Sequence, residues 1–331
     1  MIHKKTTIYF FLTFLSLSGI ADLNIFSLNA GMPPYKTTSK PVYMTISLIW
    51  QTEHLTQYDI DTLGKFREEF SSISVHHFIS PELLMGEHKK RAIEKMESVI
   101  KDEDHIGLLL GPGKKALNQL QIKTPRSADI WGGASSKTEG EVFLNAFEGE
   151  DLIKLAALGK ETIEEAFGKK VQTVMTSDWT DSLKIAYAVE RVGIPYNFSA
   201  IAPILLKGRL AGFPIYKELK RSWQEVTLLK GPFVKEDAPT IYVPQSAGSV
   251  DYLTSQDLVN LFLNQSRKPK NHKMVFHTSL HVKTMQQTLK RLSSALQEIF
   301  AISMKSNIHI KPLPKNLSHV IMTEESKEGA L

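Results

Sequence analysis

The amino-acid sequence predicts an α/β fold in which strands alternate with helices around a parallel sheet. Short apolar runs recur along the chain, and most are followed by a segment whose apolar residues repeat at three and four positions, as on one face of a helix. The 331 residues are enough for one large domain with a full core. The alternation suits an incomplete or deformed (β/α) barrel, and a flat doubly wound sheet is the alternative that the pattern alone cannot separate from it.

The elements follow one another in a regular order. The expected strands are short apolar runs between turn residues, at 42–49, 73–79, 106–110, 171–175, 240–243 and 274–277. The expected helices have one apolar face, at 59–70, 89–100, 152–167, 182–192, 254–264 and 283–300. Gly168 and Gly193 stop two of these helices, as glycine does at a helix C-terminus.

Composition excludes several classes of protein. Hydrophobic residues make up 42% and charged residues 23% of the chain, as in an ordinary globular protein. The net charge of +5 is modest, and no arginine-rich stripe is interleaved with aromatic residues, so nucleic acid is not an expected partner. The chain has no cysteine, which excludes disulfides, cysteine metal ligands, a thiol nucleophile and a lipoprotein anchor.

The N-terminus has the pattern of a secretory signal. Lys4 and Lys5 precede an almost wholly apolar run at 8–20, which is short for a membrane-spanning helix. Cleavage is expected after Ala21 or Ala30, with an uncleaved anchor as the alternative. We therefore expect a secreted or periplasmic protein with no stable membrane span after cleavage.

One domain accounts for most of the mature chain. The expected divisions are a signal peptide and linker start at 1–30, a linker at 31–40, the domain at 41–304 with insertions at about 114–150 and 207–237, and a tail at 305–331. The tail ends in TEESKEGAL, a polar composition that is typical of disordered segments.

A family resemblance rests on the text EEAFGKKVQTVMTSDW, followed later by RVGIPYNFSAIAP. It resembles the polysaccharide deacetylases, the NodB-homology family of carbohydrate esterases. In that family a helix ending in Phe-Gly leads to a strand, an arginine-containing turn that ends in tryptophan, and a helix ending in Leu-Gly. Trp179 matches the tryptophan, and Met175 stands where the arginine is expected. The resemblance covers roughly 41–300, and it implies an incomplete (β/α) barrel and action on N-acetylated polysaccharides.

The resemblance also implies a metal site, but this chain departs from it. Hydrolysis of an N-acetyl group needs a metal to polarise the carbonyl, a base to activate water and an acid to protonate the leaving amine. Ile49 stands where the family has its aspartate, and Leu109 and Gly111 stand where it has two histidines. The frame residues Trp50, Gly107, Trp179, Gly193 and His277 still match. We therefore expect no metal cofactor and no metal-dependent deacetylation.

Several ionisable residues remain candidates for chemistry. The run MVFHTSLH places His277 where the family has its leaving-group acid, and Asp178 is ionisable in the third turn, where capping the next helix is the other interpretation. The alternative for cofactors is zinc or another divalent metal bound by His277 and His281, with Asp178 or His77 as a third ligand. Glu53 and His54 lie nearby and could replace the missing aspartate, but nothing in their spacing requires it, and ordinary polar loop residues are the favoured interpretation.

These observations predict a secreted deacetylase-like protein that lacks catalysis and acts as a glycan-binding or envelope scaffold protein. The expected sugar contacts are Trp50, Gln51 and Trp179, with Trp131 or Tyr196 as further stacking platforms, although each tryptophan is equally expected in the core. One alternative is an active metal-dependent deacetylase or hydrolase with a site rebuilt around Asp178, His277 and His281. Another is a protein that binds an envelope protein partner through its two insertions.

Overall fold

A computed structural model describes residues 41–51, 56–127, 129–130, 142–236, 238–266 and 274–317. The chain divides into two units, Met1–Pro33 and Pro34–Leu331, and every described residue belongs to the second. Within the described ranges, no helix has the length and apolar character needed to cross a membrane.

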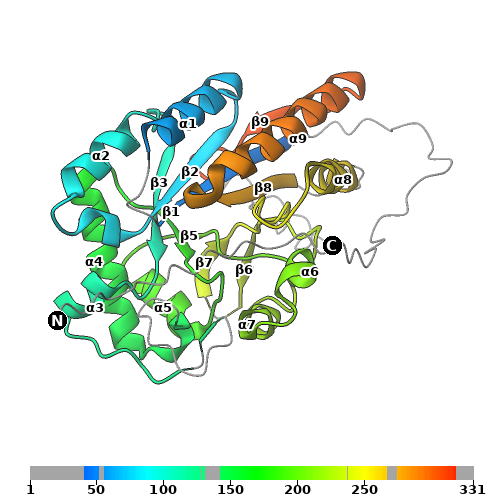
Figure 1. The fold of residues 1–331 in the computed structure, drawn as a ribbon. Helices are drawn as coiled ribbons and strands as arrows, with labels where there is room; N and C mark the ends of the chain where they lie inside the picture. The colour runs from blue at the N-terminus through cyan, green and yellow to red at the C-terminus, as the bar shows by residue number, and fades with distance from the viewer. Residues whose placement is uncertain are drawn as a thin grey trace, which may run out of the picture. The chain divides into compact units, whose positions relative to one another are not determined.

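The described strands form one sheet that does not close on itself (Figure 1). They are paired in the order β6-β7-β5-β4-β3-β2-β1-β8, and β9 pairs with β1 as well. All neighbours are parallel except β6 and β7, which are antiparallel. This is the expected incomplete (β/α) barrel. The strands are β1 Val42–Trp50, β2 Ser74–Ile79, β3 His105–Leu110, β4 Thr173–Thr176, β5 Tyr196–Asn197, β6 Phe233–Lys235, β7 Ala238–Tyr242, β8 Met274–His281 and β9 Ile310–Pro312.

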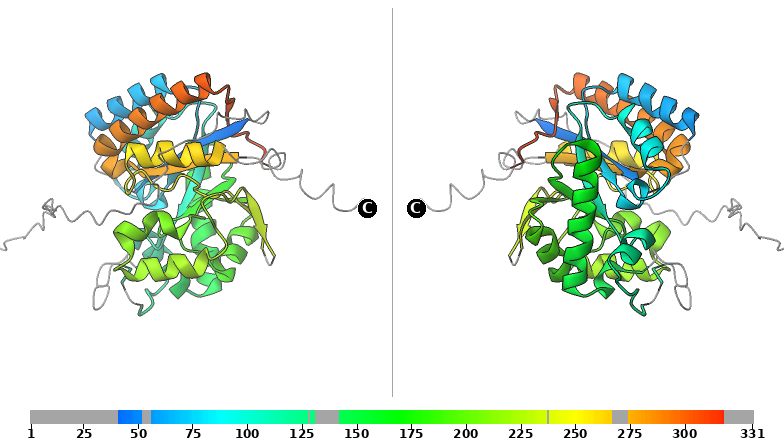
Figure 2. Two further views of the ribbon diagram at one scale, coloured as in Figure 1. Left: turned by 90° about the vertical axis from the view of Figure 1, so that its right-hand side faces the viewer. Right: turned by 90° about the vertical axis from the view of Figure 1, so that its left-hand side faces the viewer.

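Helices cover the outside of the sheet (Figure 2), with α1 against α9, α9 against α8 and α4 against α5. Local sequence explains their ends: Thr56 and Asp59 form a capping box at the start of α1, and Gly168 adopts a left-handed conformation (φ 63°) after α4. The helices are α1 Gln57–Glu69, α2 Lys89–Glu97, α3 Lys114–Gln119, α4 Gly149–Phe167, α5 Leu183–Arg191, α6 Lys207–Leu210, α7 Pro214–Ser222, α8 Ser255–Ser266 and α9 Met285–Lys305.

Two differences from the sequence expectation matter for the site. Strand β8 does not end at His277 but continues to His281, because residues up to His281 pair with β1 as far as Ile49. The strand β9 lies within the stretch expected as a tail, and it pairs in parallel with the first residues of β1. Helices α3, α6 and α7 lie within the two expected insertions.

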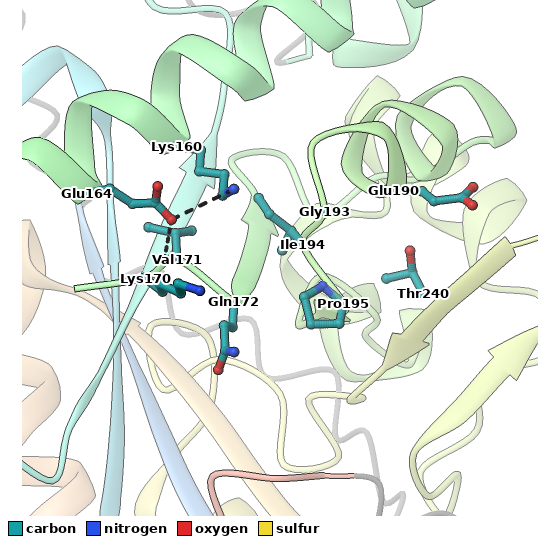
Figure 3. A pocket seen from close by; sticks show the side chains of 10 residues that line it. All are labelled: Lys160, Glu164, Lys170, Val171, Gln172, Glu190, Gly193, Ile194, Pro195 and Thr240. Atoms are coloured by element: carbon teal, nitrogen blue, oxygen red, sulfur yellow. Dashed lines mark hydrogen bonds and ion pairs between the residues drawn. The ribbon is translucent and has the colours of Figure 1, made fainter.

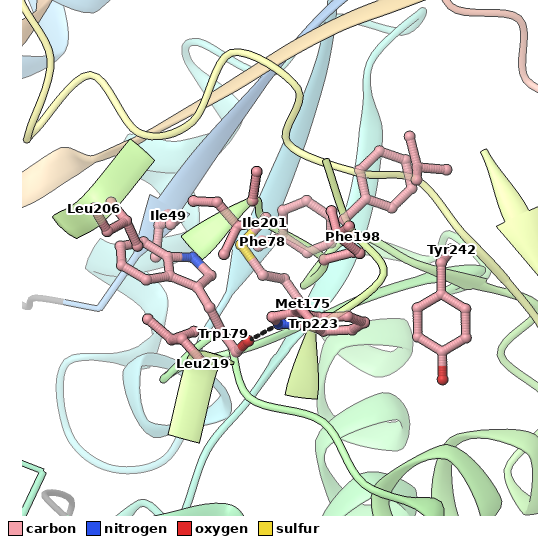
Figure 4. Packing of buried hydrophobic residues seen from close by; sticks show 14 of the residues in the cluster. Ile49, Phe78, Met175, Trp179, Phe198, Ile201, Leu206, Leu219, Trp223 and Tyr242 are labelled. Carbon is pink, nitrogen blue, oxygen red and sulfur yellow. Dashed lines mark hydrogen bonds between the residues drawn. The ribbon is translucent and has the colours of Figure 1, made fainter. Parts of the chain in front are cut away.

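The concave side of the sheet is filled by side chains from successive strands. Residues of a parallel sheet that are aligned in register share a face, so Ile49 lies beside Phe78, and Leu109 lies beside Met175. These four side chains belong to one buried hydrophobic cluster that also includes Trp179 (Figure 4).

Candidate functional site

The carboxyl edge of the sheet is the place where an active site is expected in a parallel α/β fold. In this chain it is occupied by apolar side chains. Ile49, Leu109 and Met175 are 1%, 2% and 0% exposed, and all three lie in the same cluster. Figure 4 shows Ile49 and Met175 together with the indole of Trp179. Therefore three of the positions at which the family resemblance implies an aspartate, a histidine and an arginine are part of the core.

The residues at this edge do not fit the divalent metal that the resemblance implies. Isoleucine and leucine have no donor atom, Gly111 has no side chain, and a hard or borderline cation prefers oxygen or imidazole ligands over a thioether. Among the described residues, no three histidine or carboxylate side chains are grouped so that they could hold a metal ion. Glu53 and His54 lie outside the described residues.

His277 lies inside the barrel rather than at the strand end. Its ring is fully buried, Nδ1 lies 3.2 Å from the carbonyl oxygen of Pro244, and Nε2 lies 2.8 Å from Oγ of Ser47. A carbonyl oxygen can only accept, so Nδ1 carries the proton, and Nε2 accepts a hydrogen bond from Ser47. Burial lowers the pKa of His277 to about 4 despite its hydrogen bonds to backbone carbonyls. The ring is therefore neutral at physiological pH.

His281 is the histidine that reaches the carboxyl edge. Its side chain is 21% exposed, and its Nδ1 and backbone N–H lie 2.9 and 3.1 Å from Oδ2 of Asp251. Ser249 and Thr284 also donate to this carboxylate. Burial disfavours ionisation of Asp251, but these hydrogen bonds outweigh it and hold the pKa of Asp251 below its usual range. The carboxylate thus orients the imidazole so that Nδ1 donates, which leaves Nε2 for a ligand.

The two histidines of the expected metal pair are not brought together. Both lie on one strand, and four residues of a strand span about 13 Å, which is too far for a shared ion. The expected third ligand His77 lies on the other face of the sheet from His277, because it pairs in register with Leu48, whereas His277 bonds to Ser47.

Asp178 is buried in the turn after β4. Its Oδ1 accepts from the backbone N–H of Thr180 (3.1 Å) and its Oδ2 from that of Leu144 (3.2 Å). Burial raises the pKa of Asp178 even though these N–H groups stabilise its charge. The N-cap of α5 is Ser182 instead, whose side chain accepts from Ile185. Asp178 thus joins two loops, and no hydrogen bond connects it to His277 within the described residues.

Trp50 lies in the core on the helix-facing side of the sheet. It is 1% exposed, and its Nε1 donates to Nδ1 of His77 (3.2 Å). The other ring nitrogen of His77 therefore carries the proton and donates to Asp104 (3.2 Å), whose second oxygen pairs with Arg67 at 2.5 Å. Burial lowers the pKa of His77 although Asp104 opposes the shift. This hydrogen-bonded series of four buried side chains connects β1, β2 and the residue before β3 to α1.

Trp179 lies at the carboxyl edge beside His281. Its backbone is in the left-handed region (φ 55°), and its ring contacts those of His281 and Tyr252 edge-on, at 5.7 and 6.0 Å between centroids. The side chain is 4% exposed, and its buried Nε1–H has no hydrogen-bond partner among the described residues. A buried donor without a partner costs free energy, and several other buried polar atoms of the described residues share this state.

Of the remaining expected sugar contacts, one is exposed, one is buried and one lies outside the described residues. Gln51 is exposed and directly follows β1. It lies two residues beyond Ile49, which pairs in register with His281. Tyr196 is 9% exposed and belongs to the hydrophobic cluster, and Trp131 lies outside the described residues. Asp251 is not among the residues that the sequence singles out, because it lies in an irregular segment between β7 and α8 and belongs to no recognisable motif.

Comparisons with known proteins identify the fold. No protein-family model and no curated protein sequence matches the chain. A putative polysaccharide deacetylase from Mycobacterium smegmatis superposes with a TM-score of 0.51 at 11% identity, over 88% of this chain and 95% of that chain. The chitin deacetylase of Colletotrichum lindemuthianum gives 0.44 at 8% identity (85% and 89%), and a CE4 family pseudoenzyme from Bacillus anthracis gives 0.43 at 7% (84% and 65%). The chain has the fold of the polysaccharide deacetylases.

Proposed function

We propose that this chain is an exported protein with a polysaccharide deacetylase fold that binds a glycan without deacetylating it through a metal. One observation carries the proposal. Ile49, Leu109 and Met175 pack into one buried cluster at the edge of the sheet where metal ligands and a guanidinium are expected. A metal ion at this edge would need polar ligands inside the core, where burying polar groups without partners is costly in free energy.

The glycan contacts are proposed at the same edge, around His281. Gln51 and His281 lie at the ends of neighbouring strands and offer an amide and an imidazole nitrogen, groups that hydrogen-bond sugar hydroxyl and acetamido oxygens. Trp179 packs edge-on against His281, and Tyr252 packs edge-on against Trp179.

Export and a scaffold role in the envelope are part of this proposal. Export is supported by the basic start and the apolar run at the N-terminus, which are typical of a secretory signal, and the scaffold role is inferred from the missing metal ligands.

Calorimetric titration with an N-acetylglucosamine hexamer tests the glycan proposal. We expect saturable binding, weakened at least about tenfold, or 1.4 kcal/mol, by His281→Ala and by Gln51→Ala. His88→Ala, which changes an exposed histidine before α2, is the matched control and should bind as the unchanged protein does. An absence of heat at millimolar hexamer, or equal binding by all variants, would show that this edge does not bind such glycans.

A second candidate, a hydrolase that works without a metal, is favoured by the Asp251–His281 pair, since a carboxylate-oriented imidazole is the usual general base. Release of acetate from the same hexamer, lost in Asp251→Asn and His281→Ala but not in His88→Ala, would favour this candidate. We expect no acetate release from any of the four proteins.

A further inference from the structure

A second hollow lies at the opposite edge of the sheet from His281. It has a volume of about 570 Å³ and is bounded by the connections that lead into β4 and β5 (Figure 3). Val171 and Gln172 precede β4 directly, and Pro195 precedes β5 directly, so the hollow lies at the amino ends of the strands. It is therefore separate from the carboxyl edge and from the function proposed above.

The base of this hollow is formed by buried, mostly apolar residues. Val171 and Ile194 are each 1% exposed, and Thr240, a residue of β7, is 2% exposed. The two connections begin at left-handed glycines that end α4 and α5, Gly168 (φ 63°) and Gly193 (φ 72°). An apolar base of this kind favours a ligand that has a hydrocarbon part.

Charged side chains surround the base, and the two sides differ in sign. On one side Glu164 is neutralised, because it accepts from the backbone N–H of Val171 (2.9 Å) and lies 3.8 Å from Nζ of Lys160. Lys170 lies on this same side, whereas Glu190 lies on the opposite side (Figure 3). Neither Lys170 nor Glu190 makes an ion pair within the part of the chain that the structure describes. One side thus carries an excess of positive charge and the other an excess of negative charge.

We propose that this hollow binds a small zwitterion with an apolar body, namely an amino acid or a dipeptide. The carboxylate of such a ligand would lie by Lys170 and its ammonium by Glu190, with the side chain on Val171 and Ile194. A simple anion would meet Glu190, and a simple cation would meet Lys170, so only a ligand with both charges is complementary to both sides. A volume of about 570 Å³ lies in the range of small-molecule sites.

Calorimetric titration of the full chain with glycyl-L-leucine tests this proposal. We expect saturable binding that is weakened at least about fivefold by Lys170→Ala and by Glu190→Gln, and at least about tenfold when both termini of the peptide are blocked by acetylation and amidation. Lys65→Ala and Glu68→Gln, which change exposed residues of α1 by the same chemistry, are matched controls and should leave the affinity unchanged.

Three outcomes would overturn the proposal. They are an absence of binding at millimolar dipeptide, equal affinity for the blocked and free peptides, and affinity for acetate or ethylammonium that equals that of the dipeptide. Because the changed residues are exposed and distant from His281, loss of dipeptide binding with retained glycan binding, or the reverse, distinguishes this proposal from the previous one.

Discussion

Two histidines of one strand have opposite environments. His277 is enclosed by Ser47, Pro244 and the ring of Phe198, whereas His281 is partly exposed and bound by Asp251. Both lie in the run MVFHTSLH, and which of them reaches the edge depends on where β8 ends. Long-range pairing with β1 determines that end, so local sequence could predict the strand but not which of its histidines is exposed.

The buried His277 predicts a loss of stability in acid. Its folded pKa of about 4 lies below the ordinary 6.5, so the unfolded chain binds the proton more tightly and stability falls as the pH decreases from about 6.5 towards 4. Between pH 7 and pH 5, His277 alone should account for about 2 kcal/mol of the lost unfolding free energy. Urea unfolding at the two pH values measures this loss.

The matched variant is His277→Gln, which keeps a donor and an acceptor but does not titrate. It should lose less stability than the unchanged protein between pH 7 and pH 5, by about that amount. Both proteins retain His76 and His105, whose pKa values are also lowered by burial. The unfolding free energy of both proteins should therefore still decrease in acid. An equal loss in both proteins would contradict the burial of a neutral His277.

At the scale of elements, β3 is held closely between β2 and β4. A methyl group added at Gly107 would lie 2.3 Å from Oγ1 of Thr173 and 2.8 Å from the ring of Phe78. Hydrophobic periodicity predicted this strand, since alternation and apolar runs are local. It could not reveal that the backbone of β3 approaches its neighbours so closely, because that depends on side chains from two other strands.

Gly107→Ala should therefore lower the free energy of unfolding by about 2 kcal/mol or more, because buried atoms of Thr173 and Phe78 must move. Gly64→Ala is the control: no atom lies within 4 Å of the added methyl group in α1, and alanine favours a helix, so stability should be unchanged or rise by up to about 1 kcal/mol. Chemical denaturation of the two variants measures both changes. Equal effects would show that β3 is packed less closely than described.

At the scale of the molecule, the order of strands and helices could be predicted because each element has its own periodicity, whereas the incomplete barrel followed from the family resemblance, since periodicity alone does not separate it from a flat sheet. The filling of the carboxyl edge could be predicted only in part. Ile49, Leu109 and Met175 indicated lost ligands, but their assembly with Trp179 and Phe198 into one cluster depends on strands distant in sequence. The Asp251–His281 pair depends on the same long-range assembly, since its members belong to separate segments.

Elemental analysis of the purified protein should find no zinc or other divalent metal in stoichiometric amount. The reason is that Ile49, Leu109 and Met175 have no oxygen or imidazole donor, and among the described residues no three histidine or carboxylate side chains are grouped to hold an ion. His277→Ala and His281→Ala should give the same result as the unchanged protein. One equivalent of metal that is lost in either variant would indicate a rebuilt metal site and would favour an active hydrolase.

The strand β1 is completed by segments that lie much later in the chain, β8 and β9. Ser47 and its partner His277 are 230 residues apart, and β9 adds its pairing with Val42 later still. Until those segments emerge from the ribosome, β1 has an unpaired edge that invites intermolecular pairing. We therefore expect a chain that stops before β8 to expose this edge of β1 and to aggregate rather than to form a smaller folded domain.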